Sequence, residues 1–156
     1  MYLQLYYSAM SSSTASSPQG CTNFKLRQLT RRVSHHYDVE LGKLGLKTTQ
    51  FSLISHIAKL GPIAPGKLAQ AMTMDASTLT RNLKPLIDAG WVVLEPGNDA
   101  RSRLVTLTQS GLALRTQARR HWKTAQEKLN RQLGVERVAA LHLLLDQSLA
   151  CLAQDQ

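Results

Sequence analysis

The run from Asp75 to Gly111 constrains the fold most, because it predicts a helix, a strand, a turn and a second strand in that order. Asp75 is a suitable N-cap, since its carboxylate can accept hydrogen bonds from the free N–H groups of the first helical turn. Gly90 is placed to end the helix, and Trp91 can fold back on Leu86. Apolar side chains recur at helical spacing on one face, at Leu79, Leu83, Leu86 and Ile87. The segment therefore predicts an amphipathic helix whose other face is polar.

Two short runs with strand-like composition follow this helix and predict a hairpin. They are Trp91–Leu94 and Leu104–Leu107, and the residues from Glu95 to Asp99 between them have turn chemistry. Arg101 and Arg103 fall near the tip of the hairpin. A helix with hydroxyl and arginine side chains on its polar face, followed by such a hairpin, is typical of a winged helix-turn-helix.

Three more helices are predicted ahead of this segment. Apolar side chains at three- and four-residue spacing predict one long helix from Thr22 to about Gly45. A second helix is expected between Thr48 and Gly61, and Pro65 suits the first turn of a third, short one. The short helix and the amphipathic helix after it together predict a helix-turn-helix.

Two further helices are predicted after Thr108, on either side of Gly134. One apolar stripe runs from Leu114 to Leu133, and a second runs from Val138 to Leu152. The last helix is apolar around too much of its circumference for an exposed surface helix. The first helix and these last two do not fit a compact winged-helix core, so their apolar faces need another partner. A second copy of the chain is the simplest one.

The residues around the second strand resemble the signature of a known family. Asp99, Arg101, Leu107, Thr108 and Gly111 match the wing of the MarR (multiple antibiotic resistance regulator) family, which reads D-x-R, then a strand ending in L-T, then x-x-G. The resemblance covers roughly residues 21–153 and implies a MarR-type domain that is mainly α with a small β-wing. It implies that residues 46–108 form the winged-helix DNA-binding region. Residues 21–45 and 109–153 would supply the helices of a two-fold dimerisation layer.

Residues 1–20 differ in composition from the rest of the chain. They carry no charge and are rich in Ser and Tyr, which predicts a disordered tail without the basic region of a secretory signal. The break in composition makes Met10 a candidate start. No apolar run in the sequence approaches the ~20 residues that a membrane helix needs. We therefore expect a cytoplasmic protein with no membrane partner.

The polar face of the amphipathic helix is the expected DNA-reading surface, although a solvated helix face is the simpler alternative. The side chains expected to contact DNA there are Ser77, Thr78, Thr80, Arg81 and Lys84. Arginine can read guanine in the major groove, while hydroxyl groups and Lys84 mostly hold phosphates. The resemblance implies that Arg101 enters the minor groove. Asp99 would orient Arg101 by a charge-assisted hydrogen bond, and Arg103 would face a phosphate.

The formal net charge of the chain is +9, which suits a polyanionic partner such as double-stranded DNA. The charge is not concentrated on the winged-helix region, since residues 21–60 carry +5, residues 61–108 only +1 and residues 109–156 +3. We expect a homodimeric transcriptional regulator, and specifically a repressor released from a palindromic operator by an effector. The near-neutral segment 61–108 leaves one alternative, a winged-helix protein-interaction module that does not bind DNA.

The sequence contains no pattern typical of an enzyme. It has no glycine-rich phosphate loop, no nucleophile elbow and no Cys-x-x-Cys pair. The five histidines are not spaced as a set of metal ligands. We therefore expect no catalytic residues, no metal and no cofactor.

Two kinds of effector remain open. Cys21 opens the first helix, where the dipole favours a thiolate, whereas Cys151 lies in an apolar stretch near a helix end, where burial and the dipole disfavour one. The peroxide-sensing branch of the MarR family is similar in placing a cysteine near the start of its first helix, so oxidation could release DNA. The alternative for this pair is two incidental thiols.

The other candidate effector is a small phenol or aromatic acid, which the resemblance implies would bind between the dimer layer and the winged helix. The side chains expected to line such a cavity are Phe24, Leu26, His36, Tyr37 and Trp122. The simpler alternative is that these residues belong to the core.

Overall fold

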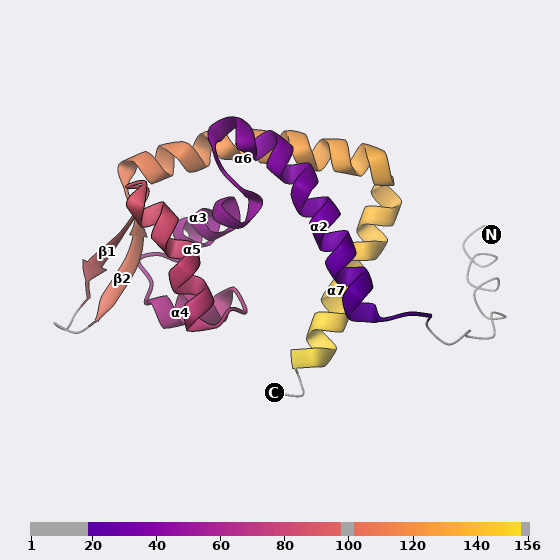
Figure 1. Cartoon of the computed structure of the whole chain (residues 1–156), viewed down its shortest axis with the longest axis horizontal. Coiled ribbons are helices and arrows are strands. Elements are labelled where there is room, and N and C mark those ends of the chain that lie inside the picture. Colours follow the sequence, from indigo (N-terminus) through magenta and orange to yellow (C-terminus); the bar gives the residue numbers. More distant parts are fainter. Residues whose placement is uncertain (1–18, 98–101, 154–156) are drawn as a thin grey trace, which may run out of the picture. The chain divides into compact units, whose positions relative to one another are not determined.

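The computed structural model describes residues 19–97 and 102–153, and it confirms the predicted fold class, mainly α with a small β-wing (Figure 1). The elements are α2 (Thr22–Leu41), a 3-10 turn η1 (Gly42–Leu44), α3 (Thr48–Leu60), α4 (Pro65–Ala71), α5 (Ala76–Asp88), β1 (Val92–Pro96), β2 (Arg103–Leu107), α6 (Gln109–Leu133) and α7 (Val135–Ala153). The chain divides into two units, residues 1–32 and 33–156. The described part of the first unit contains only the start of α2. Most of the predicted tail, including Met10, lies outside the described residues.

The ends of α5 follow the local chemistry that the sequence predicts. Asp75 is the N-cap, and its carboxylate accepts a hydrogen bond from the Thr78 backbone N–H. At the other end Gly90 adopts a left-handed conformation with a φ of 72°, which costs little without a Cβ. The N–H groups of Gly90 and Trp91 then donate to the carbonyls of Ile87 and Leu86. These two bonds form a Schellman motif, which satisfies the last helical carbonyls and turns the chain into β1.

The hairpin is longer than predicted, because β1 continues through Glu95 and Pro96, where the sequence predicts a turn. The strands are antiparallel, with Val92 opposite Leu107 and Pro96 opposite Arg103. The next pair is bonded, since the Gly97 N–H donates to the Ser102 carbonyl at 3.0 Å. Bonded and non-bonded pairs alternate along an antiparallel ladder, so Pro96 lies at a position that needs no N–H donor. Proline therefore does not end the strand.

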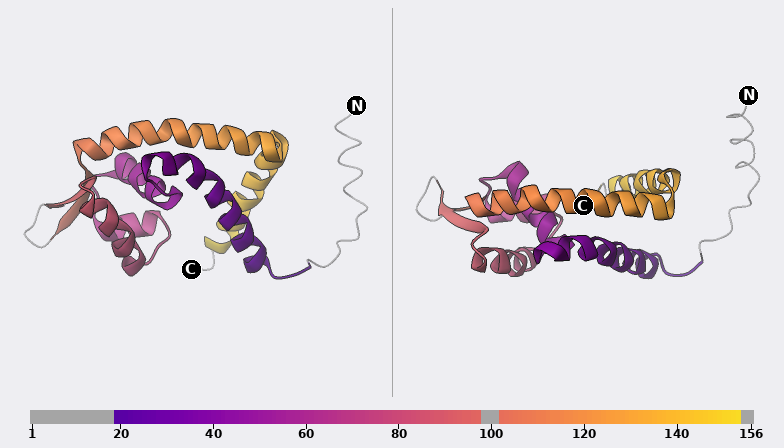
Figure 2. Two further views of the ribbon diagram at one scale, coloured as in Figure 1. Left: turned by 45° about the horizontal axis from the view of Figure 1, so that its top comes forward. Right: turned by 90° about the horizontal axis from the view of Figure 1, so that it is seen from above.

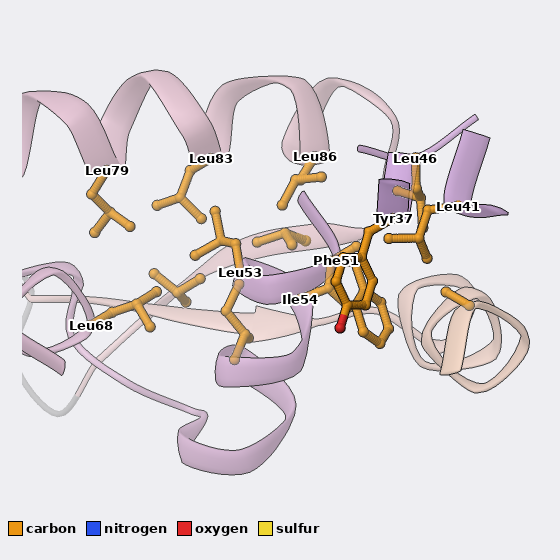
Figure 3. Close-up of a cluster of buried hydrophobic side chains, with 14 of the residues drawn as sticks. Tyr37, Leu41, Leu46, Phe51, Leu53, Ile54, Leu68, Leu79, Leu83 and Leu86 are labelled. Atoms are coloured by element: carbon orange, nitrogen blue, oxygen red, sulfur yellow. The ribbon is translucent and has the colours of Figure 1, made fainter. Parts of the chain in front are cut away.

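The hydrophobic core of residues 33–156 is centred on α3. The buried side chains of α3 are Phe51, Leu53, Ile54 and Ile57. From α5, Leu79, Leu83 and Leu86 point toward this helix (Figure 3). Backbone bonds between Ile63 and Val105, 3.1 and 2.8 Å long, join the α3–α4 connection to β2. The helix-turn-helix and the wing therefore share one core, and the hairpin projects beyond the helices next to it (Figure 2).

Helix α7 carries an apolar surface that the described part of this single chain leaves uncovered. Val138 is its buried residue, whereas Leu143, Leu144, Leu149 and Leu152 are each about 60% exposed. Cys151 is exposed as well, so within one chain it is not the buried thiol that the sequence suggested. The apolar neighbours that suggested burial lie on the same uncovered helix. Among the described residues, no helix has both the length and the apolar character needed to cross a membrane.

Candidate nucleic-acid interface

Asp75 organises the first turn of α5. Its carboxylate accepts hydrogen bonds from the hydroxyl of Ser77 at 2.6 Å, from the hydroxyl of Thr78 at 2.7 Å and from the Thr78 N–H at 2.7 Å. These bonds hold the pKa of Asp75 well below its usual range, and the bond from Ser77 has the largest effect. The carboxylate therefore stays ionised at neutral pH, and the two hydroxyl groups are held in fixed positions at the exposed start of the helix.

Arg81 lies one turn further along and folds back over this first turn. Its Nε donates to the Ser77 carbonyl and one terminal nitrogen donates to the Thr78 hydroxyl, both at 3.4 Å. Bonds of this length are weak, so the guanidinium can leave them for a better acceptor. The Thr80 hydroxyl donates to the Ala76 carbonyl at 2.8 Å, which commits its proton to the helix.

Lys84 and Arg103 are the remaining predicted DNA contacts that the structure describes. Lys84 is paired with Asp88 at 2.9 Å, and both side chains are well exposed. An exposed ion pair of this kind contributes little free energy, so Lys84 can exchange its partner. Arg103 begins β2 and is exposed. Asp99 and Arg101, which the family signature assigns to the wing tip, lie outside the described residues.

The structure thus brings the five predicted residues of the reading helix together on one helix. The core-facing residues Leu79, Leu83 and Leu86 lie opposite Ser77, Arg81 and Lys84. A helix with one face buried and the other carrying fixed hydroxyls and an available guanidinium has the chemistry needed to enter a major groove.

A separate cavity of about 450 Å³ lies between α3 and α6. Its lining residues are Tyr37, Thr48, Phe51, Ser52, Ser55, His56, Arg115, Arg119 and Trp122. The ring of Trp122 stacks against those of Tyr37 and Phe51, with centroid distances of 6.4 and 6.5 Å. Burial raises the pKa of the Tyr37 phenol. The Nε of Arg115 is buried and has no hydrogen-bond partner among the described residues.

Of the predicted residues in the unit that holds this cavity, Tyr37 and Trp122 line it and His36 does not. Phe24 and Leu26 belong to the other unit, residues 1–32, so their place in this cavity stays a prediction. The Nε2 of His36 is within 3.0 Å of the Ala125 carbonyl oxygen, so this ring contributes to the attachment of α2 to α6. Sequence reasoning missed Arg115 and Arg119, although their spacing of i, i+4 and i+7 with Trp122 places all three on one helical face.

A buried carboxylate links the end of α2 to α6, and no pattern in the sequence indicates it. Glu40 is only 3% exposed and accepts hydrogen bonds from the ammonium groups of Lys43 and Lys128, while His121 Nδ1 lies 3.8 Å away. The bonds from Lys128 and Lys43 lower the pKa of Glu40 to about 2. Only the fold brings Lys128 to Glu40, so periodicity along either helix could not reveal the pair.

Comparison with known proteins identifies the family to which these features belong. Residues 44–102 match the family model described as MarR family. The multiple antibiotic resistance protein MarR of Salmonella typhimurium is 32% identical over 130 residues, which span 82% of this chain and 88% of that protein. The chain belongs to the MarR family. It is therefore a DNA-binding transcriptional regulator, and family members are not enzymes.

Solved structures of MarR-family proteins agree with this assignment. A mutant of MarR from E. coli in complex with operator DNA superposes with a TM-score of 0.75 at 28% identity, covering 81% of this chain and 92% of that one. The transcriptional regulator MosR of M. tuberculosis, in complex with DNA, has a TM-score of 0.71 at 28% identity. The match covers 85% of this chain and 98% of that one. The winged helix-turn-helix inferred from the sequence is confirmed.

Proposed function

We propose that this MarR-family regulator is a homodimeric repressor that binds a palindromic operator through α5 and the wing. The observation that carries the proposal is the exposed start of α5, where Asp75 fixes two hydroxyl groups beside the available guanidinium of Arg81. In the groove, Arg81 would read a guanine edge, while Ser77 and Thr78 would hold phosphates by turning their hydroxyl protons from the Asp75 carboxylate to a phosphate oxygen. Thr80 and Lys84 would flank them.

The wing would add a second set of contacts. Arg101 would enter the minor groove with Asp99 orienting it, and Arg103 would face a phosphate, as the family signature implies. The DNA complexes of the related MarR and MosR proteins support DNA as the partner of this fold.

Homodimer formation is supported by the uncovered apolar surface of α7. Its exposed leucines leave water only if another apolar surface covers them, and a second copy offers the same surface by two-fold symmetry. Two reading helices related in this way would meet half-sites about one helical turn apart, which is why the operator would be a palindrome. Residues 21–45 and 109–153 would form the dimer layer, and 46–108 the DNA-binding region.

The test is selection of bound fragments from genomic DNA, followed by anisotropy titrations of the recovered site at several salt concentrations. We expect a palindromic site, a complex containing two protomers, and an affinity that falls steeply with salt, because phosphate contacts release counterions. Equal binding to the selected site and to a scrambled duplex would contradict a sequence-specific reader. No binding to either would favour the interaction-module alternative.

For the effector, the cavity between α3 and α6 favours a small aromatic acid or a phenol. Three stacked rings offer a flat apolar surface, and the unpartnered Arg115 Nε offers a hydrogen bond to an anionic group. Benzoate-type acids and neutral phenols should therefore quench Trp122 fluorescence and lower operator affinity. Replacement of Trp122 by Leu should remove both effects, whereas Trp91→Phe should keep them. If these compounds still lower the operator affinity of Trp122→Leu, the effector binds at another site.

Oxidation is the other candidate release signal. Cys21 and Cys151 are both exposed, so both thiols are accessible to peroxide in the described single chain. Peroxide would convert a thiolate to a sulfenic acid and release hydroxide, and a second thiol would then condense with the sulfenic acid to a disulfide and water. Non-reducing gels should show a covalent dimer that is absent in Cys21→Ser. If Cys21→Ser responds to peroxide as the wild type does, the oxidation route is wrong.

A further inference from the structure

A second cationic cleft lies along one flank of the reading helix. It has a volume of about 280 Å³ and is formed by the start of α3 and the middle of α5. Its lining residues are Lys47, Thr49, Gln50, Arg81, Asn82 and Pro85. Two of these side chains are cations, and none of the described residues that line the cleft is acidic.

The polar groups of the cleft are suited to a phosphate. The side-chain oxygen of Gln50 already accepts a hydrogen bond from the backbone N–H of Lys47 at 2.9 Å. The side-chain amide nitrogen of Gln50 is therefore the group available to a ligand. Among the described residues, the amide nitrogen of Asn82 has only the weak acceptor Met74 Sδ, at 3.8 Å. The hydroxyl of Thr49 completes a set of donors around two positive charges. This is the chemistry that recognises a phosphate oxygen.

The carboxylates on the elements that pack around the cleft do not line it and so do not neutralise its positive charge. Asp38 accepts the Thr48 N–H at 2.6 Å and is thus engaged at the start of α3 without lining the cleft. Asp75 is engaged by Ser77 and Thr78. Lys47 takes part in no ion pair within the described part of the chain.

The two flanks of α5 differ in charge. The opposite flank borders Pro65 at the start of α4 and Leu94 of β1, and there Lys84 is balanced by Asp88. A helix that enters the major groove runs between two phosphate backbones, and in a helix-turn-helix the first helix crosses one of them. Because α4 lies on the Lys84 flank, the other backbone would pass along the flank that carries Lys47.

We propose that this cleft binds a backbone phosphate of the operator, with Lys47 as the cation that contacts the phosphate, while Arg81 at the border of the cleft reads the base edge and adds positive potential. The inference rests on the proposed function, and it adds the start of α3 to the DNA-binding surface. Each subunit holds one backbone on the α4 side and the other in the Lys47 cleft, so α5 is fixed in the groove from both flanks. Phosphate contacts carry no base sequence, so Lys47 contributes affinity and orientation without specificity.

The test is the salt dependence of DNA binding by Lys47→Gln. Anisotropy titrations of the selected operator and of a scrambled duplex, each at four salt concentrations, give the slope of log K against log salt. We expect the slope to fall by about 0.9 for each phosphate that the variant no longer neutralises, which corresponds to about eightfold weaker binding per phosphate at 0.1 M salt if binding is equal at 1 M. The reduction in affinity should be similar on both duplexes.

Lys59→Gln is the matched control, because it makes the same charge change in the last turn of the same helix, α3. Its slope should equal that of the wild type, and Lys47→Arg should restore most of the slope. Equal thermal unfolding of Lys47→Gln and wild type excludes a folding defect. An unchanged slope in Lys47→Gln, or weaker binding confined to the operator, would overturn the phosphate assignment while leaving the proposed function intact. Failure of the wild type to bind any DNA would contradict the proposed function itself.

Discussion

Replacing Gly111 with alanine should destabilise the junction between the wing and α6. A Cβ at this position would lie 2.1 Å from the Trp91 carbonyl oxygen, whereas real contacts are not closer than 3.0 Å. The contact is with backbone, so no side-chain rotation relieves it, and the chain must shift by at least 0.9 Å (from 2.1 to 3.0 Å). The same oxygen accepts the Thr108 N–H at 3.0 Å, so a shift also weakens that bond.

The expected loss of folding free energy follows from these two effects, the steric overlap and the weakened hydrogen bond. Overpacking in a close-packed site costs about 1–3 kcal/mol, and a weakened backbone hydrogen bond adds about 1 kcal/mol. We therefore expect Gly111→Ala to lower the free energy of unfolding by about 2–4 kcal/mol, measured by urea denaturation at one fixed protein concentration. Gly66, which lies in α4, is the control, because a Cβ added there meets no atom within 4 Å. Gly66→Ala should be neutral or stabilising by up to about 1 kcal/mol. If Gly111→Ala unfolds within about 0.5 kcal/mol of the wild type, the reasoning is wrong.

Three further outcomes are expected. Because Lys128 and Lys43 lower the pKa of Glu40 from 4.5 to about 2, the stability that its ionised form provides is complete above about pH 4.5 and is lost as the pH falls toward 2. The Tm difference between wild type and Glu40→Gln should therefore be constant near neutral pH and narrow over that acid range. Leu149→Asp should give monomers or insoluble protein by light scattering, since it places a charge in the proposed apolar interface, and a monomeric wild type would contradict that interface. Arg101→Ala should weaken operator binding by about 1–3 kcal/mol with the dimer intact, and unchanged affinity at fixed salt would refute the wing assignment.

Local signals explain why so much of the fold could be predicted from the sequence. Asp75 and Gly90 specify the two ends of α5 through groups that lie within a few residues of each other, so a cap and a C-terminal glycine are readable from the chain alone. The apolar spacing of α5 likewise gives its buried face directly. The strand end at Pro96 was missed, because whether a proline can stay in a strand depends on which pairs of the ladder are bonded, and that register is set by the partner strand.

The parts of the site that the sequence did not predict depend on contacts between distant residues. Lys128 reaches Glu40, and Arg115 lines one cavity with Tyr37 and Phe51, only after α2, α3 and α6 have packed together. The Lys47 cleft likewise needs α3 and α5 side by side. The sequence also suggested His36, next to Tyr37 along the chain, as a cavity residue. A helix sends neighbouring side chains in different directions, and His36 bonds the α6 backbone.

The central claim, that α5 reads the operator, is tested most directly by the operator affinity of Arg81→Ala at one fixed salt concentration. The guanidinium lies exposed over Ser77 and Thr78 and supports no core residue, so its removal should leave folding and dimer formation unchanged. We predict that binding to the selected operator weakens by about 1–3 kcal/mol, roughly 5- to 150-fold in Kd, with a much smaller effect on a scrambled duplex. Operator affinity equal to that of the wild type would contradict the assignment of α5 as the reading helix.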